Sequence, residues 1–198
     1  MSLFVFGGAF DPIHNGHLDI VSYLQQVASY EQLLIIPTGQ PVHKKATFFS
    51  NECRFEMLSA VFDSHPLTTI CDYELQRQQP SYTVDTINFI QHEYGSSNIT
   101  LVVGFDQLYQ FHRWRNYETI LSTCQLLVVL RQGIDHERLL NMFPDELVPF
   151  KHKISIHELY PTNISSTQIR IKIQKKQSIA GDVPDVVLPI ITHYLKQI

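Results

Sequence analysis

Cysteine and long apolar runs are both scarce in this 198-residue chain. The three cysteines, Cys53, Cys71 and Cys124, lie far apart and form no Cys-x-x-Cys pair, which argues against a cysteine zinc site and a disulfide framework. No apolar run approaches the roughly 18 residues of a membrane-spanning helix. The first residues lack a basic stretch and Asp11 interrupts their apolar run, so we expect no signal peptide and a cytoplasmic location.

An excess of basic charge is also absent. The chain has 15 Lys and Arg residues against 19 Asp and Glu residues, a net charge of -4. We therefore expect no nucleic-acid partner, although a local basic cluster for a small phosphorylated ligand is allowed. An apolar fraction of 44% and a charged fraction of 17% argue against disorder. We expect one domain over 1–198 with a helical C-terminal part over 165–198, and the sequence leaves monomer and homodimer open.

Short apolar runs alternate with stretches of helical periodicity. Such runs suit strands buried on both faces, and they occur at 3–6, 33–36, 67–71, 100–103, 125–130 and 153–156. Helical spacing predicts helices around 17–24, 51–62, 84–91 and 184–196, the last with Pro184 near its start. This alternation predicts an α/β fold, a Rossmann-like doubly wound parallel sheet with helices on both faces and a small C-terminal helical segment. Residues 37–50 show no period and are expected to form a long loop of the functional kind.

The strongest motif runs from Gly7 to His17 and has the sequence Gly-Gly-Ala-Phe-Asp-Pro-Ile-His-Asn-Gly-His. It follows the first predicted strand and opens the first predicted helix, where ligands bind in doubly wound sheets. Gly7 and Gly8 let the backbone approach a ligand, and the helix start offers N–H groups and a positive dipole end that suit a phosphate. His14 and His17 are three residues apart, so both rings can reach one anion, and Gly16 leaves room for a base or ribose.

Simpler explanations of this motif remain open. A Gly-Gly pair also occurs in ordinary turns at strand ends, and a histidine at a helix start is often a cap or a surface residue. A histidine pair at this spacing could bind a metal, but no third ligand at natural spacing is visible. The pattern matches neither a Walker loop nor Gly-x-Gly-x-x-Gly. The combination of strand, Gly-Gly, Asp-Pro and His-x-Gly-His is more specific than its parts.

A second motif, Ile-Ser-Ser-Thr-Gln-Ile-Arg, occupies residues 164–170. Ser165, Ser166 or Thr167 is expected to cap the helix that follows. The simplest interpretation is a capped helix that carries a surface arginine. The alternative is a second phosphate site, in which these hydroxyls and the Arg170 guanidinium hold phosphate oxygens.

The first motif resembles the signature of the HxGH nucleotidyltransferases, which transfer a nucleoside monophosphate from a nucleoside triphosphate and release pyrophosphate. The second motif resembles the segment that holds the triphosphate in those enzymes. The resemblance implies that ATP is bound by residues of both motifs and by two residues after a later strand. These are Gly7, Gly8, Ala9, Phe10, His14, Gly16, His17, Gly104, Asp106, Ser165, Ser166, Thr167 and Arg170.

Between the two motifs the chain is similar to the bacterial nicotinate mononucleotide adenylyltransferases. The similar segments are Pro-x-His-Lys at 41–44, Glu-Leu-Gln-Arg at 74–77, Pro-Ser-Tyr-Thr at 80–83 and Gly-Phe-Asp at 104–106. The resemblance implies an acceptor site formed by Phe10, His43, Lys44, Tyr82, Thr83, Val84, Asp106, Trp114 and Arg115.

Several of these acceptor residues have a physical role available. Trp114 could stack on a pyridine ring, or it could be a core residue. Backbone N–H groups near Thr83 and Val84 receive the nicotinate carboxylate in the arrangement that the resemblance implies. Arg115 is expected to add positive potential that favours the acid over the amide. Asp106 could accept hydrogen bonds from a ribose, or it could cap a helix.

The implied reaction transfers AMP from ATP to nicotinate mononucleotide in NAD biosynthesis, giving nicotinate adenine dinucleotide and pyrophosphate. The attacking phosphate is ionised at neutral pH, so no general base is expected, and positioning and charge stabilisation account for catalysis. His14, His17, Lys44 and Arg170 are the expected catalytic residues. Mg²⁺ is the expected cofactor, held by the ATP phosphates and water and not by protein ligands. A phosphopantetheine adenylyltransferase-like enzyme and a non-catalytic nucleotide-sensing module are the alternatives.

Overall fold

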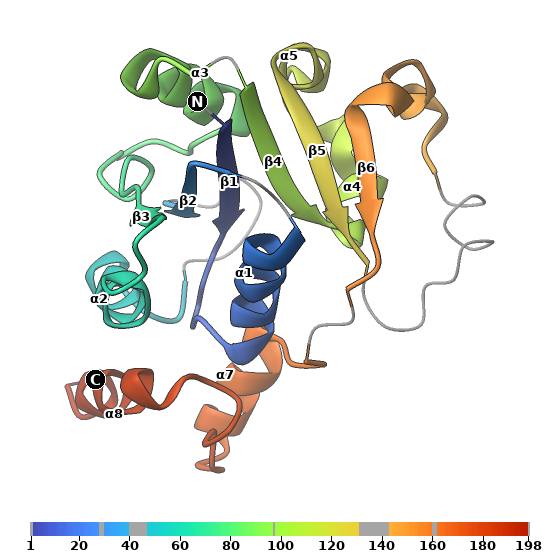
Figure 1. Ribbon diagram of the computed structural model, residues 1–198. Coiled ribbons are helices and arrows are strands. Elements are labelled where there is room, and N and C mark those ends of the chain that lie inside the picture. The colour runs from blue at the N-terminus through green and yellow to red at the C-terminus, as the bar shows by residue number, and fades with distance from the viewer. Residues whose placement is uncertain are drawn as a thin grey trace.

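The computed structural model describes residues 2–27, 30–39, 47–96, 98–130, 143–159 and 162–197. Its centre is a six-stranded sheet made of β1 Ser2–Gly8, β2 Gln32–Pro37, β3 Thr68–Ile70, β4 Asn98–Gly104, β5 Cys124–Val129 and β6 Ile154–His157. The strands lie in the order β3-β2-β1-β4-β5-β6, and every neighbouring pair is parallel (Figure 1). The six predicted strands and the doubly wound parallel sheet are confirmed.

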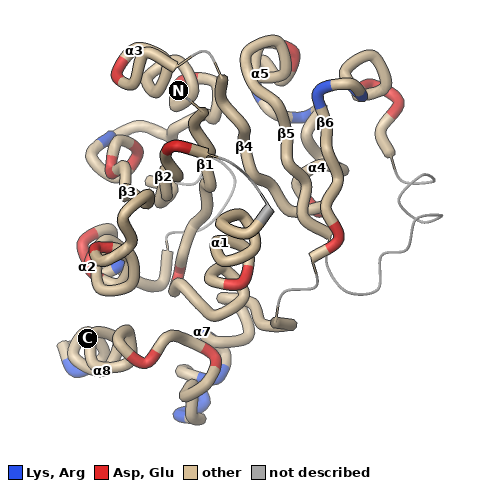
Figure 2. The backbone as a smooth tube through the Cα atoms, in the orientation of Figure 1, with Lys and Arg blue, Asp and Glu red and all other residues tan. Residues whose placement is uncertain are grey.

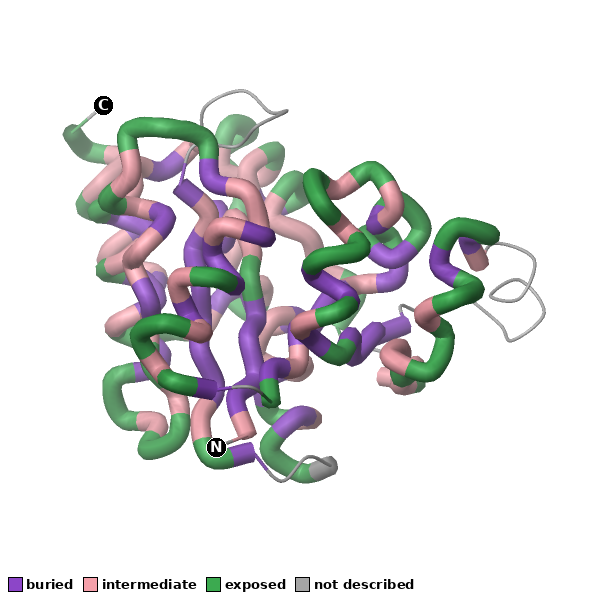
Figure 3. Tube along the Cα trace, turned by 90° about the horizontal axis from the view of Figure 1, so that it is seen from above, coloured by how far each residue is buried: buried purple, intermediate pink, exposed green. Residues whose placement is uncertain are grey.

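Helices cover both faces of this sheet. One hydrophobic cluster packs the sheet against α3 Thr83–Tyr94, α4 Phe105–Gln110 and α5 Tyr117–Thr123. The other packs it against α1 Asn15–Val27, α2 Asn51–Phe62, α7 Ser166–Gln174 and α8 Leu188–Leu195. Short 3-10 helices occupy η1 Phe111–Arg113, η2 Asp145–Lys153 and η3 Asp185–Val187. Because the central strands are buried on both faces (Figure 3), their sequences are continuous apolar runs instead of alternating patterns.

The sequence predictions missed the short helices between β4 and β5. α4, η1 and α5 span fewer residues than the window over which a helical period can be recognised. The expectation that Pro184 lies near the start of the last helical segment is confirmed, because Pro184 is the N-cap of η3 and η3 continues directly into α8 at Leu188. A second proline, Pro189, lies in the first turn of α8, where a missing N–H costs nothing. Of the predicted loop 37–50, residues 40–46 lie outside the described part of the chain.

The order of the strands reverses at β1. After β1 the chain forms β2 and β3 on one side, and it then crosses to form β4 on the other side. β1 ends at Gly7 and Gly8, β4 ends at Gly104, and the register pairs Phe6 with Val102, so the two ends are adjacent. Ligands of open parallel α/β sheets bind at such a reversal, so the fold and the first motif point to the same place.

The C-terminal segment returns to the start of α1 (Figure 1). The backbone N–H of Asn15 donates to the carbonyl of Asp182 at 3.0 Å, and its side-chain amide donates to the carbonyl of Gly181 at 2.8 Å. Thr162 donates to the carboxylate of Asp19 through its N–H at 2.7 Å and its hydroxyl at 2.6 Å. These bonds fasten the second motif beside the first.

Basic and acidic positions are interspersed over the described residues (Figure 2). A basic run lies at the end of α7, where Lys172, Lys175 and Lys176 occur, and Lys172 pairs with Asp182 at 2.6 Å. In the described part of the chain no helix has both the length and the apolar character needed to cross a membrane.

Candidate active site

The glycine turn after β1 is compact and is closed by an aromatic ring. Phe10 has a backbone φ of 45°, in the left-handed region that a bulky residue rarely adopts. Its buried ring lies edge-on to the ring of Phe6, with centroids 5.6 Å apart, and 4.9 Å from the ring of His17. A Cβ on Gly8 would come within 3.2 Å of the Phe10 ring, so a side chain there would require this buried ring to shift by a few tenths of an ångström. The packing of the Phe10 ring against Phe6 and His17 therefore holds the turn in this backbone conformation.

The two histidines of the motif lie together, as the sequence predicted. Their rings stack with centroids 3.7 Å apart and planes inclined by 22°. His14 is buried directly before α1, and His17 lies in the first turn of α1. The N–H of His14 donates to Nδ1 of His17 at 3.2 Å, so the proton of the neutral His17 ring is on Nε2, which acts as a donor. The geometry thus presents a hydrogen-bond donor at the helix N-terminus, where an anion is favoured.

Gly16 lies close to a distant part of the chain. A Cβ at this position would lie 3.0 Å from the carbonyl oxygen of Thr162 and 3.2 Å from Nδ1 of His14. A side chain at this position would therefore meet the chain itself, and the expected contact of Gly16 with a base or ribose stays a prediction. The close approach comes from the segment before α7, which crosses the start of α1 and is fastened there through Asp19.

The second motif lies against the first. Ser165 is the N-cap of α7 and forms a capping box with Gln168, so the predicted cap is confirmed. The hydroxyl of Ser166 donates to the carbonyl of Pro12 at 3.0 Å. Arg170 donates to the carbonyl of Asp11 at 2.7 Å and to the hydroxyl of Thr167 at 3.1 Å. The structure thus brings Ser166, Thr167 and Arg170 to the outer side of the Asp-Pro step of the first motif.

Two charged residues beneath the turn were missed by sequence reasoning. Arg54 of α2 is fully buried, donates to the carbonyl of Ala9 at 2.7 Å and to Oδ1 of Asn51 at 2.7 Å. Burial lowers the pKa of this guanidinium, and the carboxylate of Asp11 opposes that shift. Asp11 accepts hydrogen bonds from the N–H groups of Phe48 and Phe49, both at 2.8 Å.

The helical period of α2 contained the signal for Arg54. Arg54 shares a face with Leu58 and Val61, at spacings of i, i+4 and i+7, and both of those residues are buried. An arginine on the apolar face of a helix is rarely buried without a hydrogen-bond partner, and here the partner is the glycine turn.

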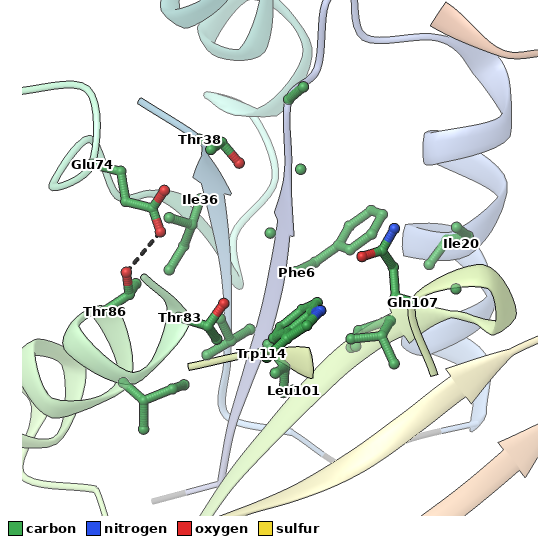
Figure 4. A pocket seen from close by; sticks show the side chains of 18 of the residues that line it. Phe6, Ile20, Ile36, Thr38, Glu74, Thr83, Thr86, Leu101, Gln107 and Trp114 are labelled. Atoms are coloured by element: carbon green, nitrogen blue, oxygen red, sulfur yellow. Dashed lines mark hydrogen bonds between the residues drawn. The ribbon is translucent and has the colours of Figure 1, made fainter. Parts of the chain in front are cut away.

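A cavity of about 450 Å³ opens where β1 and β4 end (Figure 4). Its volume suits a small-molecule ligand. Predicted site residues that line it are Gly7, Gly8, Ala9, His17, Thr83, Gly104, Asp106 and Trp114. Further lining side chains that sequence reasoning had not selected include Phe6, Thr38, Glu74, Ser81, Thr86 and Gln107.

Other predicted residues lie outside the cavity lining. Those of the described part are Phe10, His14, Gly16, Tyr82, Val84, Arg115, Ser165, Ser166, Thr167 and Arg170. His43 and Lys44 lie outside the described residues, so their roles stay predictions. Val84 is buried in the core cluster that packs α3 on the sheet.

One end of the cavity is formed by the start of α3 and by Trp114. Tyr82 is the N-cap of α3 and makes no side-chain cap bond, and helical geometry leaves the N–H groups of Thr83 and Val84 without an intrahelical partner. The indole of Trp114 stacks on the buried ring of Phe111, with centroids 4.7 Å apart. Trp114 is thus packed on the core and also part of the cavity wall (Figure 4), and its stacking on a pyridine ring stays a prediction.

Arg115 and Asp106 occupy specific positions at this end. The guanidinium carbon of Arg115 lies 4.6 Å from the centroid of the Tyr82 ring, in a cation–π arrangement. Arg115 therefore joins the Trp114 segment to the start of α3. Asp106 lies in the first turn of α4, whose N-cap is Gly104, and it lines the cavity.

Glu74 is a buried carboxyl in the cavity wall. It accepts a hydrogen bond from the hydroxyl of Thr86 at 2.7 Å (Figure 4) and another from the backbone of Gly39. Burial raises the pKa of this carboxyl, and the hydrogen bonds and Arg77 oppose the shift. A Cβ on Gly39 would lie 2.0 Å from the carbonyl oxygen of Glu74, so only glycine fits there. The resemblance had indicated the segment around Glu74 but no role for the residue.

Comparison with known proteins identifies relatives of this chain over most of its length. The model of the family described as cytidylyltransferase-like matches residues 5–172. A protein of Pectobacterium atrosepticum named probable nicotinate-nucleotide adenylyltransferase is 33% identical over 97% of this chain and 94% of its own length. A protein of the same name from Legionella pneumophila is 32% identical over 94% of each chain.

A solved structure shares the fold. It is the nicotinic acid mononucleotide adenylyltransferase of Plasmodium falciparum complexed with NaAD, which superposes with a TM-score of 0.78 over 98% of this chain and 95% of that chain, at 16% identity. The family match and the relatives above 30% identity cover most of the sequence. The chain therefore belongs to the cytidylyltransferase-like family, among the relatives named nicotinate-nucleotide adenylyltransferases.

Proposed function

We propose that this protein transfers the adenylyl group of ATP to nicotinate mononucleotide, releasing pyrophosphate and forming nicotinate adenine dinucleotide for NAD biosynthesis. The observation that carries the proposal is the stacked pair of His14 and His17 beside the glycine turn, at one end of a cavity whose other end is Trp114 and the start of α3. One end suits the phosphates of a nucleotide, and the other suits a flat ring that bears an acidic group.

The reaction needs positioning and charge stabilisation more than proton transfer. The 5′-phosphate of the acceptor is already ionised near neutral pH, so it can attack the α-phosphorus of ATP in line without a general base. His17 donates from Nε2 to an oxygen of the α-phosphate as charge moves onto the departing pyrophosphate. Arg170 donates to the carbonyl of Asp11, its side chain is 28% exposed, and it neutralises the β- and γ-phosphates.

The acceptor is held at the other end. Its pyridine ring stacks on the indole of Trp114, and its carboxylate accepts hydrogen bonds from the N–H groups of Thr83 and Val84 at the positive end of α3. Asp106 accepts hydrogen bonds from a ribose. Arg115, fixed on the ring of Tyr82, adds positive potential that favours the acid over the amide.

We propose that Mg²⁺ enters with ATP and is held by its phosphates and by water. The donors at the glycine turn fit this arrangement, because imidazole nitrogens are poor ligands for this hard cation. Among the described residues no group of three or more His, Cys, Asp or Glu side chains is placed to hold a metal ion. Bound with ATP, the ion would neutralise charge on the phosphates. The side chains of His17, Arg170 and Trp114 bind and orient the substrates.

The direct test is the initial rate of pyrophosphate release with ATP, Mg²⁺ and each of four acceptors. These are nicotinate mononucleotide, nicotinamide mononucleotide, phosphopantetheine and glycerol 3-phosphate. We expect a clear preference for nicotinate mononucleotide. A preference for phosphopantetheine would transfer the assignment to that class of adenylyltransferase. ATP binding by the folded protein without release on any acceptor would indicate a nucleotide sensor.

A further inference from the structure

A series of hydrogen bonds joins the glycine turn to the segment that carries Glu74. At one end, the guanidinium of Arg54 donates to the carbonyl of Ala9 at 2.7 Å and to Oδ1 of Asn51 at 2.7 Å. The side-chain amide of Asn51 in turn donates from Nδ2 to the carbonyl of Leu75 at 3.1 Å. Asn51 therefore contacts both the residue that holds the glycine turn and the segment that follows β3.

The segment around Leu75 is part of the cavity wall. Its neighbour Glu74 lines the cavity and accepts hydrogen bonds from the hydroxyl of Thr86 at 2.7 Å (Figure 4) and from the backbone of Gly39. The packing here is tight, because a Cβ on Gly39 would overlap the carbonyl oxygen of Glu74. Thr86 also donates to the carbonyl of Tyr82, the N-cap of α3, at 3.4 Å. A shift of the backbone at Leu75 would therefore reach both the end of β2 and the start of α3.

We propose that Asn51 is a positioning residue, which holds the glycine turn through Arg54 and the acceptor wall through Leu75 in one fixed arrangement. This inference rests on the proposed function, which assigns the glycine turn to ATP and the start of α3 to the mononucleotide. An in-line attack needs the two nucleotides in a defined relative position. Asn51 lies outside the cavity lining, so it acts on both substrates through the residues that it holds.

The side-chain amide of Asn51 allows its two links to be separated, because one atom accepts and the other donates. In Asn51→Asp, the carboxylate still accepts from Arg54 but has no donor for the carbonyl of Leu75. Asn51 is the first residue of α2, where the helix dipole favours a carboxylate. The gain at the helix start and at Arg54 opposes the loss at Leu75, so the melting temperature should change little. Asn51→Ala loses both links.

The experiment compares steady-state kinetics of wild type, Asn51→Asp and Asn51→Ala. For Asn51→Asp we expect KM for nicotinate mononucleotide to rise about fivefold, the scale of one hydrogen bond between neutral groups, with KM for ATP within about twofold. For Asn51→Ala both KM values should rise. Nicotinamide mononucleotide should be affected as much as nicotinate mononucleotide, because the wall moves and no contact to the ring substituent is lost. Asn98→Asp, at the exposed start of β4 and outside the cavity lining, is the matched control and should leave both KM values unchanged.

The outcomes distinguish this inference from the proposed function. A wild type that does not use nicotinate mononucleotide would overturn both. An active wild type whose Asn51→Asp variant keeps its KM for that acceptor, or changes only KM for ATP, would overturn the role of Asn51 alone. Equal rises of both KM values in Asn51→Asp, with a lower melting temperature, would make Asn51 a stabilising residue of α2 only. A smaller acceptor-induced rise in melting temperature for Asn51→Asp, with an unchanged rise for ATP, would support the assignment.

Discussion

The backbone N–H of His14 donates to Nδ1 of His17, and this bond decides which nitrogen of His17 is its donor. Since Nδ1 accepts, Nε2 of the neutral ring must bear the proton. The same contact holds the two rings face to face, 3.7 Å apart, at the N-terminus of α1. His17 therefore has a defined orientation before any nucleotide binds, which is the condition under which one donor can stabilise a transition state effectively.

The first prediction concerns this donor. His17→Ala should lower kcat by about 100-fold or more, on the scale of one lost transition-state donor, while the protein stays folded. Initial rates of pyrophosphate release and the melting temperature measure both effects.

Two amide variants separate the roles of the ring nitrogens. Asparagine can replace Nδ1 as the acceptor for His14 but has no group at the place of Nε2, so His17→Asn should be folded and as slow as His17→Ala. Glutamine reaches the place of Nε2 with an amide donor, so His17→Gln should recover part of the rate. An unfolded His17→Ala, or a fast His17→Asn, would assign the ring a structural role.

The second prediction concerns Arg54, whose guanidinium holds the carbonyl of Ala9 from within the core. Arg54→Met removes both hydrogen bonds and leaves Asp11 with less compensating charge, so the free energy of unfolding should fall by about 3 kcal/mol. KM for ATP should rise because the glycine turn loses its support. Urea unfolding and initial rates measure these changes. Arg113→Met, at an exposed position of η1, should change stability by no more than about 0.5 kcal/mol, and an equal effect of the two would contradict the role of Arg54.

The sequence predicted the fold well because each strand and each long helix of a doubly wound sheet has a recognisable pattern of apolar residues. Each strand is a short apolar run bounded by turn residues, and α1, α2 and α3 are long enough to show a helical period. The segment 105–123 did not yield its short helices, because its order comes from packing of Phe111 and Trp114 and not from a repeat. Pro184 was placed correctly at the start of the last helical segment, because the fixed φ of proline suits the beginning of a helix.

The site was predictable where the chemistry is local and not where it depends on tertiary contacts. The meeting of His14 and His17 follows from their spacing at a helix start. The contact of Arg54 with Ala9 joins residues separated by α1 and β2, and the contact of Glu74 with Thr86 spans 12 residues, so neither belongs to a helical or strand period. The close approach of Thr162 to Gly16 has the same origin, since the two residues lie at opposite ends of the chain.

The third prediction concerns the preference for the acid over the amide. Arg115→Ala should lower the ratio of kcat/KM for nicotinate over nicotinamide mononucleotide by about fivefold, the scale of an exposed charge interaction of about 1 kcal/mol. Arg113→Ala removes the same charge from a neighbouring exposed position without the contact to Tyr82, so its ratio should change less. The effect of Arg115→Ala should shrink at high salt. An unchanged ratio would show that the guanidinium serves only to pack on Tyr82.

The fourth prediction is a pH dependence of stability that originates at Glu74. Burial raises the pKa of this carboxyl in the folded protein above its ordinary value of 4.5. The folded state therefore binds the proton of Glu74 more tightly than the unfolded state does. This proton stabilises the folded protein fully at a pH below the pKa of Glu74 in the unfolded chain, and the stabilisation is lost as the pH rises through the pKa of Glu74 in the folded protein. Glu74→Gln resembles the protonated form at every pH and keeps an acceptor oxygen for Thr86.

The difference in unfolding free energy, Glu74→Gln minus wild type, should thus grow as the pH rises from 4.5 and then level off. Between the two pKa values it should grow by about 1.4 kcal/mol per pH unit, as measured by urea unfolding from pH 4.5 to 8. Glu52 provides a control of opposite sign, because its own backbone N–H and Ser50 lower its pKa at the start of α2. The advantage of wild type over Glu52→Gln should therefore decline as the pH falls. If the difference in unfolding free energy between Glu74→Gln and wild type did not change over this pH range, the carboxyl of Glu74 would be ionised in the folded protein. The hydrogen bonds from Gly39 and Thr86 would then offset the cost of burying its charge.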